Sequence, residues 1–160
     1  MAGHGTETDT EAKPLAVRCQ CGNASFPTPT AKPKILFYCH CTECQKQTSS
    51  AFGTSAIYTS DGLLPLSPDL AGRMKVFHRQ TEKGRSMECY FCSECGSRMF
   101  HRIISADGKP RNTVSIKGGC IEGLEWNWSG SMHIFMRSAV IDIPAEFEQY
   151  ETLPPWMKMD

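Results

Sequence analysis

The sequence predicts an all-β domain that binds metal, and three observations support this prediction, the first two for the fold class and the third for the metal. Short runs of β-branched, aromatic and aliphatic residues recur along the chain, separated by glycine, proline and other turn residues. No stretch of useful length repeats apolar residues with the 3.6-residue period of a helix. Nine cysteines gather mostly in three tight clusters, a pattern that indicates metal binding. The length of 160 residues suits one domain.

The candidate strands follow one another from residue 15 onward. We expect them at residues 15–19, 34–39, 53–59, 74–79, 86–91, 98–103, 113–117 and 133–138. The polar residues 79–84 suit a hairpin loop between two of these strands. Residues 41–50 contain no glycine, proline or aliphatic side chain, so a short helical turn is expected beside the middle cysteine cluster.

The two ends of the chain differ from the middle. Residues 1–13 are rich in Gly, Thr, Glu and Asp without periodicity, which predicts a disordered tail. The single domain is then expected at residues 14–150. Residues 151–160 are interpreted as a C-terminal tail that ends the chain on the surface.

Charge and hydropathy exclude several classes of partner. The 17 basic and 17 acidic residues cancel, which argues against the basic face that nucleic-acid binding needs. No apolar run is long enough to cross a membrane, and the N-terminal residues do not match a secretory signal. We therefore expect a cytoplasmic protein that binds neither nucleic acid nor membrane. An odd number of cysteines in a reducing compartment makes a poor disulfide framework. The oligomeric state stays open.

The first and last cysteine clusters have the form of zinc knuckles. They occupy residues 19–22 (CQCG) and 92–96 (CSECG), and both end in Cys-Gly. The glycine matters because the residue after the second cysteine of a knuckle often needs a positive φ. Two knuckles together supply the four thiolates of a closed, tetrahedral structural zinc site. The predicted ligands are Cys19, Cys21, Cys92 and Cys95.

The middle cluster, residues 39–44 (CHCTEC), predicts a different kind of site. Cys39, Cys41 and Cys44 can converge on one metal from a single loop. Three protein ligands leave a coordination position open for water or a substrate thiol, as in catalytic zinc sites. Two alternatives stay open: a reactive cysteine group without metal, and a second closed site. The residues that could close it are His40, His101, Cys89 and Cys120.

Polar residues near these clusters are candidates for supporting roles. Glu43 and Thr42 could orient water or protons, although a solvated Glu43 carboxylate fits equally well. Cys89 lies on a candidate strand, where a buried structural thiol is expected. Three further side chains could anchor substrate carboxylates or lie solvated on a strand face: Arg98, Arg102 and Lys117.

With these motifs in place, the chain resembles the glutathione-dependent formaldehyde-activating family, also called the centromere protein V family. The resemblance is carried by residues 19–22 (CQCG), 39–53 (CHCTECQKQTSSAFG) and 91–97 (FCSECGS). Weaker matches are residues 117–119 (KGG) and 133–135 (HIF). Together they extend over nearly the whole expected domain.

The resemblance implies a fold, two metals and an activity. The fold would be a β-tent (Mss4-like), a set of antiparallel sheets pinned by zinc. The family pattern assigns Cys19, Cys21, Cys92 and Cys95 to a structural zinc, and Cys39, Cys41 and Cys44 to a second, functional zinc, which makes two Zn²⁺ per chain. The implied activity is the condensation of formaldehyde with glutathione to S-hydroxymethylglutathione, classed as a carbon–sulfur lyase read in reverse.

Several functions are compatible with this pattern. The leading hypothesis is a zinc-dependent carbon–sulfur lyase-like enzyme whose substrate is a small thiol or carbonyl compound, possibly a glutathione adduct. A second is a zinc-dependent lyase or isomerase of a small secondary metabolite on the same scaffold. A third is a non-catalytic, zinc-stabilised binding module, which the zero net charge disfavours. A methionine sulfoxide reductase-like protein fits poorly, because its zinc uses two Cys-x-x-Cys pairs.

Overall fold

The computed structural model describes residues 12–158, so the predicted disordered tail lies almost entirely outside the described part of the chain. These residues form two sheets, which confirms the all-β class and is consistent with an Mss4-like fold. The smaller sheet pairs β1 (Ala16–Arg18) with β2 (Ser25–Pro27). The larger has eight strands in the order β10-β9-β3-β4-β8-β7-β6-β5. Their bounds are β3 (Ile35–Cys39), β4 (Gly53–Thr59), β5 (Met74–Gln80), β6 (Ser86–Cys92), β7 (Arg98–Ile104), β8 (Thr113–Lys117), β9 (Met132–Ile134) and β10 (Gln149–Tyr150).

Helical elements are short and connect the strands. The α-helices are α1 (Thr42–Thr48), which lies where the sequence predicts a helical turn, and α2 (Pro68–Arg73). In the described part of the chain, three 3₁₀ helices span Gly118–Cys120, Met136–Ser138 and Pro155–Met157. Within residues 12–158, no helix has the length and apolar character needed to cross a membrane.

The strands from β3 to β8 lie within one residue of their expected bounds at each end. The expectation of a strand over residues 133–138 is wrong beyond Ile134. Phe135 takes a left-handed conformation with φ of 58°, and a 3₁₀ helix follows. The amide of Phe135 donates instead to the carbonyl of Thr152, so the C-terminal segment replaces the continued strand as its partner. The pairings of β9 with β3 and with β10 are parallel, whereas the resemblance implies antiparallel sheets.

The two faces of the large sheet have different surroundings. Because side chains alternate along a strand, Ala56 and Tyr58 of β4 enter the main hydrophobic core, together with Ile116 of β8. The intervening residues Ser55 and Ile57 face the other side and line a pocket. The sheet therefore packs the core on one face and supports the pocket with the other.

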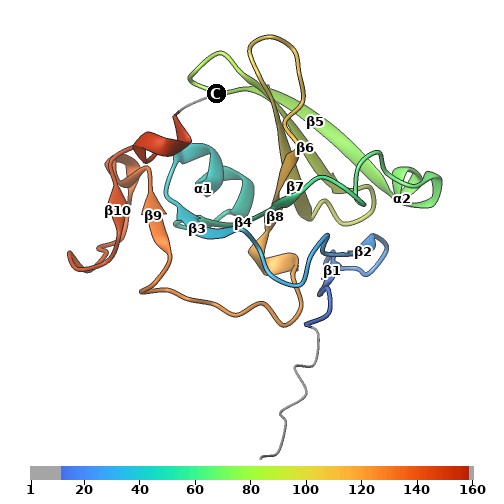
Figure 1. Cartoon of the computed structure of the whole chain (residues 1–160), viewed down its shortest axis with the longest axis horizontal. Coiled ribbons are helices and arrows are strands. Elements are labelled where there is room, and N and C mark those ends of the chain that lie inside the picture. The colour runs from blue at the N-terminus through green and yellow to red at the C-terminus, as the bar shows by residue number, and fades with distance from the viewer. Residues whose placement is uncertain (1–11, 159–160) are drawn as a thin grey trace, which may run out of the picture.

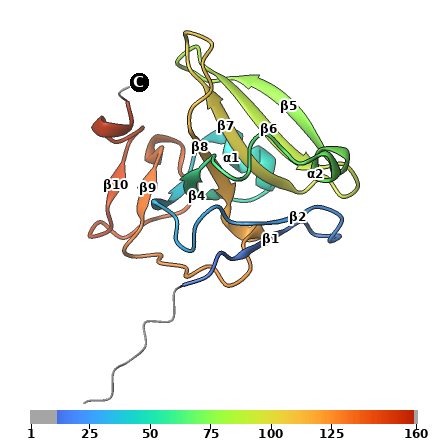
Figure 2. The same cartoon turned by 45° about the vertical axis from the view of Figure 1, so that its right-hand side comes forward.

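The arrangement of the strands determines what borders this pocket. Figure 1 shows β9 and β10 on one side of the molecule and the β5–β6 hairpin on the other, with α1 between them. The view in Figure 2 shows the same order, and it places β1 and β2 at the foot of the sheet, away from the hairpin tip.

One glycine is required by the close approach of β4 to the end of β8. A Cβ atom on Gly118 would lie 2.7 Å from Cγ2 of Thr54, a stiff β-branched side chain, and 3.2 Å from the Trp126 ring. A Cβ atom on Gly119 would have no heavy atom within 4 Å apart from those of its chain neighbours. The two adjacent glycines thus differ in the space they offer.

We predict that Gly118→Ala lowers the free energy of unfolding by about 1–3 kcal/mol, the usual cost of overpacking. Gly119→Ala is the matched control and should change it by less than about 0.5 kcal/mol. Thermal denaturation measures both, with about 2–4 °C of Tm for each kcal/mol in a chain of this size. Equal Tm values for the two variants would contradict the close approach.

Candidate metal centres and pocket

The first candidate metal centre joins the start of the chain to the end of β6. The sulfur atoms of Cys19, Cys21, Cys92 and Cys95 all lie within 4.8 Å of one another. Cys19 and Cys21 have Sγ atoms 3.6 Å apart, and those of Cys21 and Cys92 are 3.8 Å apart. A tetrahedron with zinc–sulfur bonds of about 2.3 Å has edges of about 3.8 Å. This group could hold a metal ion, and its donor set is consistent with zinc.

Backbone geometry at this centre has the features expected of two knuckles. Gly22 and Gly96 have φ angles of +79° and +74°, a backbone conformation that residues with a Cβ atom rarely adopt. Backbone amides are turned toward the sulfurs: Ala24 N donates to Cys19 Sγ at 3.2 Å, and Glu94 N donates to Cys92 Sγ at 3.4 Å. Such hydrogen bonds favour the thiolate form that binds metal.

The second candidate centre is built on the bend from β3 into α1. Cys39 ends β3, Cys41 is the N-cap of α1, and Cys44 lies in its first turn, so that their three sulfurs come within 4.8 Å of one another. The Cys41 sulfur accepts a hydrogen bond from the Cys44 amide at 3.3 Å. A Cβ atom on Gly53 would lie 3.2 Å from Cys44 Cβ, so the glycine allows α1 to approach β4 closely.

Among the described residues, no fourth histidine, cysteine or carboxylate joins these three sulfurs. The residues that could have closed the site are engaged elsewhere. His40 contacts His133, and His101 contacts Arg98. Cys89 is fully buried on β6, where burial raises its pKa. Cys120 packs against the main core, and burial raises its pKa to about 11. A metal ion on the three thiolates would retain an open position.

Hydrogen bonding concentrates negative charge on one sulfur of this cluster. Donation from the Cys39 and Cys44 thiols, with help from the Cys44 backbone amide, lowers the pKa of Cys41. The same hydrogen bond to Cys41, together with burial, raises the pKa of Cys39. Hydrogen bonding to Cys39 and the charge of Lys117 lower the pKa of Cys44, but the bond to Cys41 and burial outweigh them and raise it.

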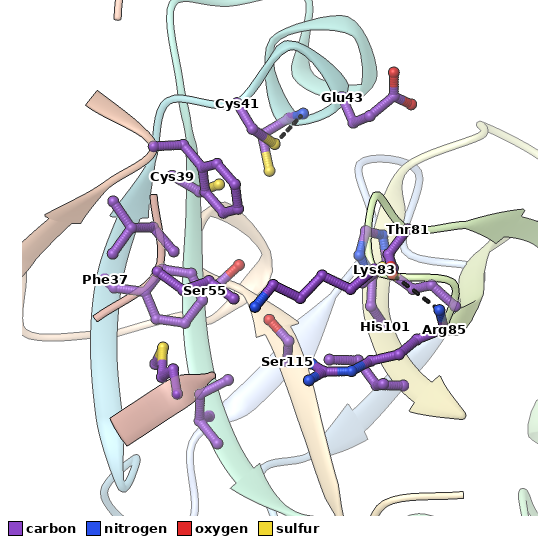
Figure 3. A pocket seen from close by; sticks show the side chains of 18 of the residues that line it. Phe37, Cys39, Cys41, Glu43, Ser55, Thr81, Lys83, Arg85, His101 and Ser115 are labelled. Atoms are coloured by element: carbon purple, nitrogen blue, oxygen red, sulfur yellow. Dashed lines mark hydrogen bonds between the residues drawn. The ribbon is translucent and has the colours of Figure 1, made fainter. Parts of the chain in front are cut away.

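The three cysteines line one end of a cavity of about 590 Å³, a size typical of small-molecule sites. Its floor consists of pocket-facing residues of the large sheet, including Ser55, Ser115 and Lys117. Figure 3 shows Cys39 and Cys41 at one end, and Lys83 and Arg85 extending inward from the β5–β6 loop. The cavity therefore opens onto the sulfurs of the second centre.

Cationic side chains outnumber acidic ones in the lining. Among the described residues, seven lysines and arginines and two glutamates line the cavity. Lys117 is only 8% exposed, and its ammonium donates to Ser55 Oγ at 3.1 Å. Within residues 12–158 it has no carboxylate partner. A buried cation of this kind favours an anionic ligand or group in the cavity.

Some of the other side chains predicted to support the site line the cavity, and others lie outside it. Glu43 and Thr42 both line the cavity, but the Glu43 carboxylate pairs with Lys46 at 3.2 Å, and Figure 3 shows it pointing away from Cys39 and Cys41. Of the three candidate anchors, only Lys117 lines this cavity. Arg98 instead donates to His101 at 3.2 Å, and Arg102 pairs with Glu88 at 3.4 Å.

A buried histidine pair lies on the opposite side of the cysteine loop. Nε2 of His40 is 3.0 Å from Nδ1 of His133, whose own Nε2 is 3.2 Å from the carbonyl oxygen of Trp128. Since a carbonyl only accepts, His133 donates to it and His40 donates to His133. Burial and the neighbouring His133 lower the pKa of His40 to about 4, so the pair is neutral near pH 7. His40 lies between Cys39 and Cys41 in the sequence. In an extended chain, neighbouring side chains point to opposite sides, so this spacing could have indicated that His40 points away from the two cysteines.

Comparison with known families gives a match that covers most of the described chain. The family model described as glutathione-dependent formaldehyde-activating enzyme matches residues 14–138. The chain belongs to this family. The matched residues include the cysteines of both candidate centres and the strands of the cavity floor. A search of curated proteins found no match.

We predict that the two centres are separable by substitution. Cys92→Ser should prevent stable folding, because the binding energy of a structural metal is folding energy. Cys41→Ser should fold with its β-rich circular dichroism intact and contain one metal ion fewer. Metal analysis and thermal denaturation measure these outcomes.

Cys120→Ser is the matched control, since Cys120 belongs to neither sulfur group, and it should retain both metal ions. A Cys92→Ser variant that melts like the unmodified protein, beside an unfolded Cys41→Ser variant, would show that the roles of the two centres are reversed.

Proposed function

We propose that the protein is a zinc-dependent, carbon–sulfur lyase-like enzyme acting on an adduct between a thiol and a carbonyl compound, similar to an S-hydroxymethylglutathione synthase. Glutathione is the thiol that the family description suggests. In this proposal Cys19, Cys21, Cys92 and Cys95 hold a structural zinc. Cys39, Cys41 and Cys44 hold the second, catalytic zinc.

One observation carries the proposal: three sulfurs without a fourth protein ligand in the described chain line a cation-rich cavity. A purely structural second metal would gain nothing from an open side facing a cavity. When bound there, zinc supplies an open coordination position that can hold a thiol as its thiolate or polarise a carbonyl.

The side chains around the sulfurs suit the formation or cleavage of a hemithioacetal. In the condensing direction, the thiol sulfur forms a bond to the carbonyl carbon while the carbonyl π electrons move to its oxygen. The proton lost by the thiol returns to that oxygen. Lys117 acts electrostatically on Cys44 and is paired with Ser55, so these two groups can donate hydrogen bonds to the developing negative oxygen. We therefore assign Lys117 to the reacting oxygen rather than to a remote carboxylate.

We predict that glutathione binds to the second metal through sulfur. In cobalt-substituted protein, added glutathione should raise the thiolate-to-cobalt charge-transfer absorption. A free thiol has a pKa near 8.5 and is bound deprotonated, so apparent affinity should rise about tenfold per pH unit toward that value and level off above it. Titrations across this range, monitored by absorption, measure both effects.

S-methylglutathione is the matched control, because it has the same carboxylates but no ionisable thiol. It should leave the charge-transfer band unchanged. If glutathione also leaves the band unchanged at every pH, the proposed sulfur chemistry is wrong, and a lyase or isomerase acting on a sulfur-free metabolite becomes the better hypothesis.

A further inference from the structure

We infer that the substrate is amphiphilic, with an anionic part and a bulky apolar part on opposite sides of the reacting sulfur. This inference rests on the proposed function, because it names the substrate class of the same cavity. It follows from the uneven distribution of side chains in the lining. Apolar side chains gather on the side of β3, β9 and the C-terminal segment, Arg79 and Lys83 lie on the side of β5 and its loop to β6, and the second cysteine cluster lines one end of the cavity.

The apolar wall comes from β3, β9 and the C-terminal segment. Cys39, Cys41 and Cys44 belong to or pack against a hydrophobic cluster that also contains Phe37 and Ile134. Partly buried Leu153 and Met157 pack against the same cluster and line the cavity. Trp156 lines the cavity as well and is 48% exposed. Because its ring is not buried in the core, it offers apolar surface to a ligand.

The C-terminal segment is fixed in this position by backbone hydrogen bonds. β10 pairs in parallel with β9, and the Phe135 and Arg137 amides donate to the carbonyls of Thr152 and Glu151 at 3.1 and 3.3 Å. Pro154 is fully buried. The segment lies after residue 138, where the match to the family model ends. The C-terminal part of this wall, including Leu153 and Trp156, therefore lies outside the residues that the family model matches, and variable segments that border a conserved scaffold commonly determine specificity.

The cationic wall comes from β5 and its loop to β6 on the opposite side. Arg79 and Lys83 line the cavity there, and neither forms an ion pair within residues 12–158. Glu82 of the same loop lines the cavity too, but its charge is balanced by Arg137 from the segment after β9. Figure 3 shows Lys83 extending into the cavity from this loop. An anionic group of a ligand would meet these side chains, while its apolar group would meet Trp156 and Leu153.

Binding of two thioethers tests the inference on the metal-loaded, full-length chain. S-benzylglutathione and S-methylglutathione carry the same charges and no thiol, and they differ only in apolar bulk. Isothermal titration calorimetry should give about tenfold or more tighter binding of the benzyl compound, the usual effect of burying a phenyl group. Trp156→Ala should remove most of this preference, and Trp156→Phe should retain it.

Two further variants distinguish the contributions of the apolar and the cationic wall to binding. Trp126→Ala removes another exposed tryptophan, one that does not line the cavity, and should leave the benzyl preference unchanged. Lys83→Gln should weaken the binding of both thioethers by the same factor, so the ratio of their affinities should not change. It should also reduce the salt dependence of binding.

Equal affinities for the two thioethers, or a benzyl preference that persists in Trp156→Ala, would overturn the inference even if glutathione alters the cobalt spectrum. A benzyl preference that depends on Trp156, in a protein whose cobalt spectrum does not respond to glutathione, would support the amphiphilic pocket and reject the thiol chemistry.

Discussion

The bend between β3 and α1 is the constraint on which the chemistry of the pocket depends. It brings the sulfurs of Cys39, Cys41 and Cys44 within 4.8 Å of one another at one end of the cavity. The bend is held from several sides. Gln45 donates to the carbonyls of His40 and Ser138, both at 2.8 Å, which ties α1 to the segment after β9. The small Gly53 lets α1 approach β4. Three thiolates fixed in this way are pre-organised for a metal ion without a fourth protein ligand.

The two cysteine groups have different structural surroundings, and the difference is consistent with different roles. The first links residues about 70 positions apart through two knuckles, as the contact of Cys21 with Cys92 shows. A metal ion bound by these four cysteines would close a long loop of the folded chain and support the junction of the two sheets, so its binding energy would contribute to folding. The second draws its three cysteines from a single short segment and faces the cavity. Loss of the first should therefore affect folding, and loss of the second should affect chemistry.

Much of the site could be predicted from local patterns. The cysteine spacings and the Cys-Gly pairs indicated both sulfur groups. The strand predicted over residues 113–117 is present as β8 and carries Lys117, a predicted candidate, into the cavity lining. The rest depends on contacts distant in sequence. The arginine and lysine side chains of the β5–β6 loop become a wall only because that hairpin faces β9 and β10 across the cavity. In the C-terminal segment, Leu153 and Met157 have no period that predicts burial, and the two-residue β10 is too short to predict.

X-ray absorption at the zinc edge tests the central claim, the open position on the second metal, most directly. In protein with both centres occupied, the account predicts one zinc bound by four sulfurs and one bound by three sulfurs and a lighter oxygen or nitrogen ligand. Spectra of the unmodified protein and of Cys41→Ser, compared with each other, isolate the second site. Added glutathione should replace the lighter ligand by sulfur. All-sulfur coordination of both metals before any thiol is added would contradict the account.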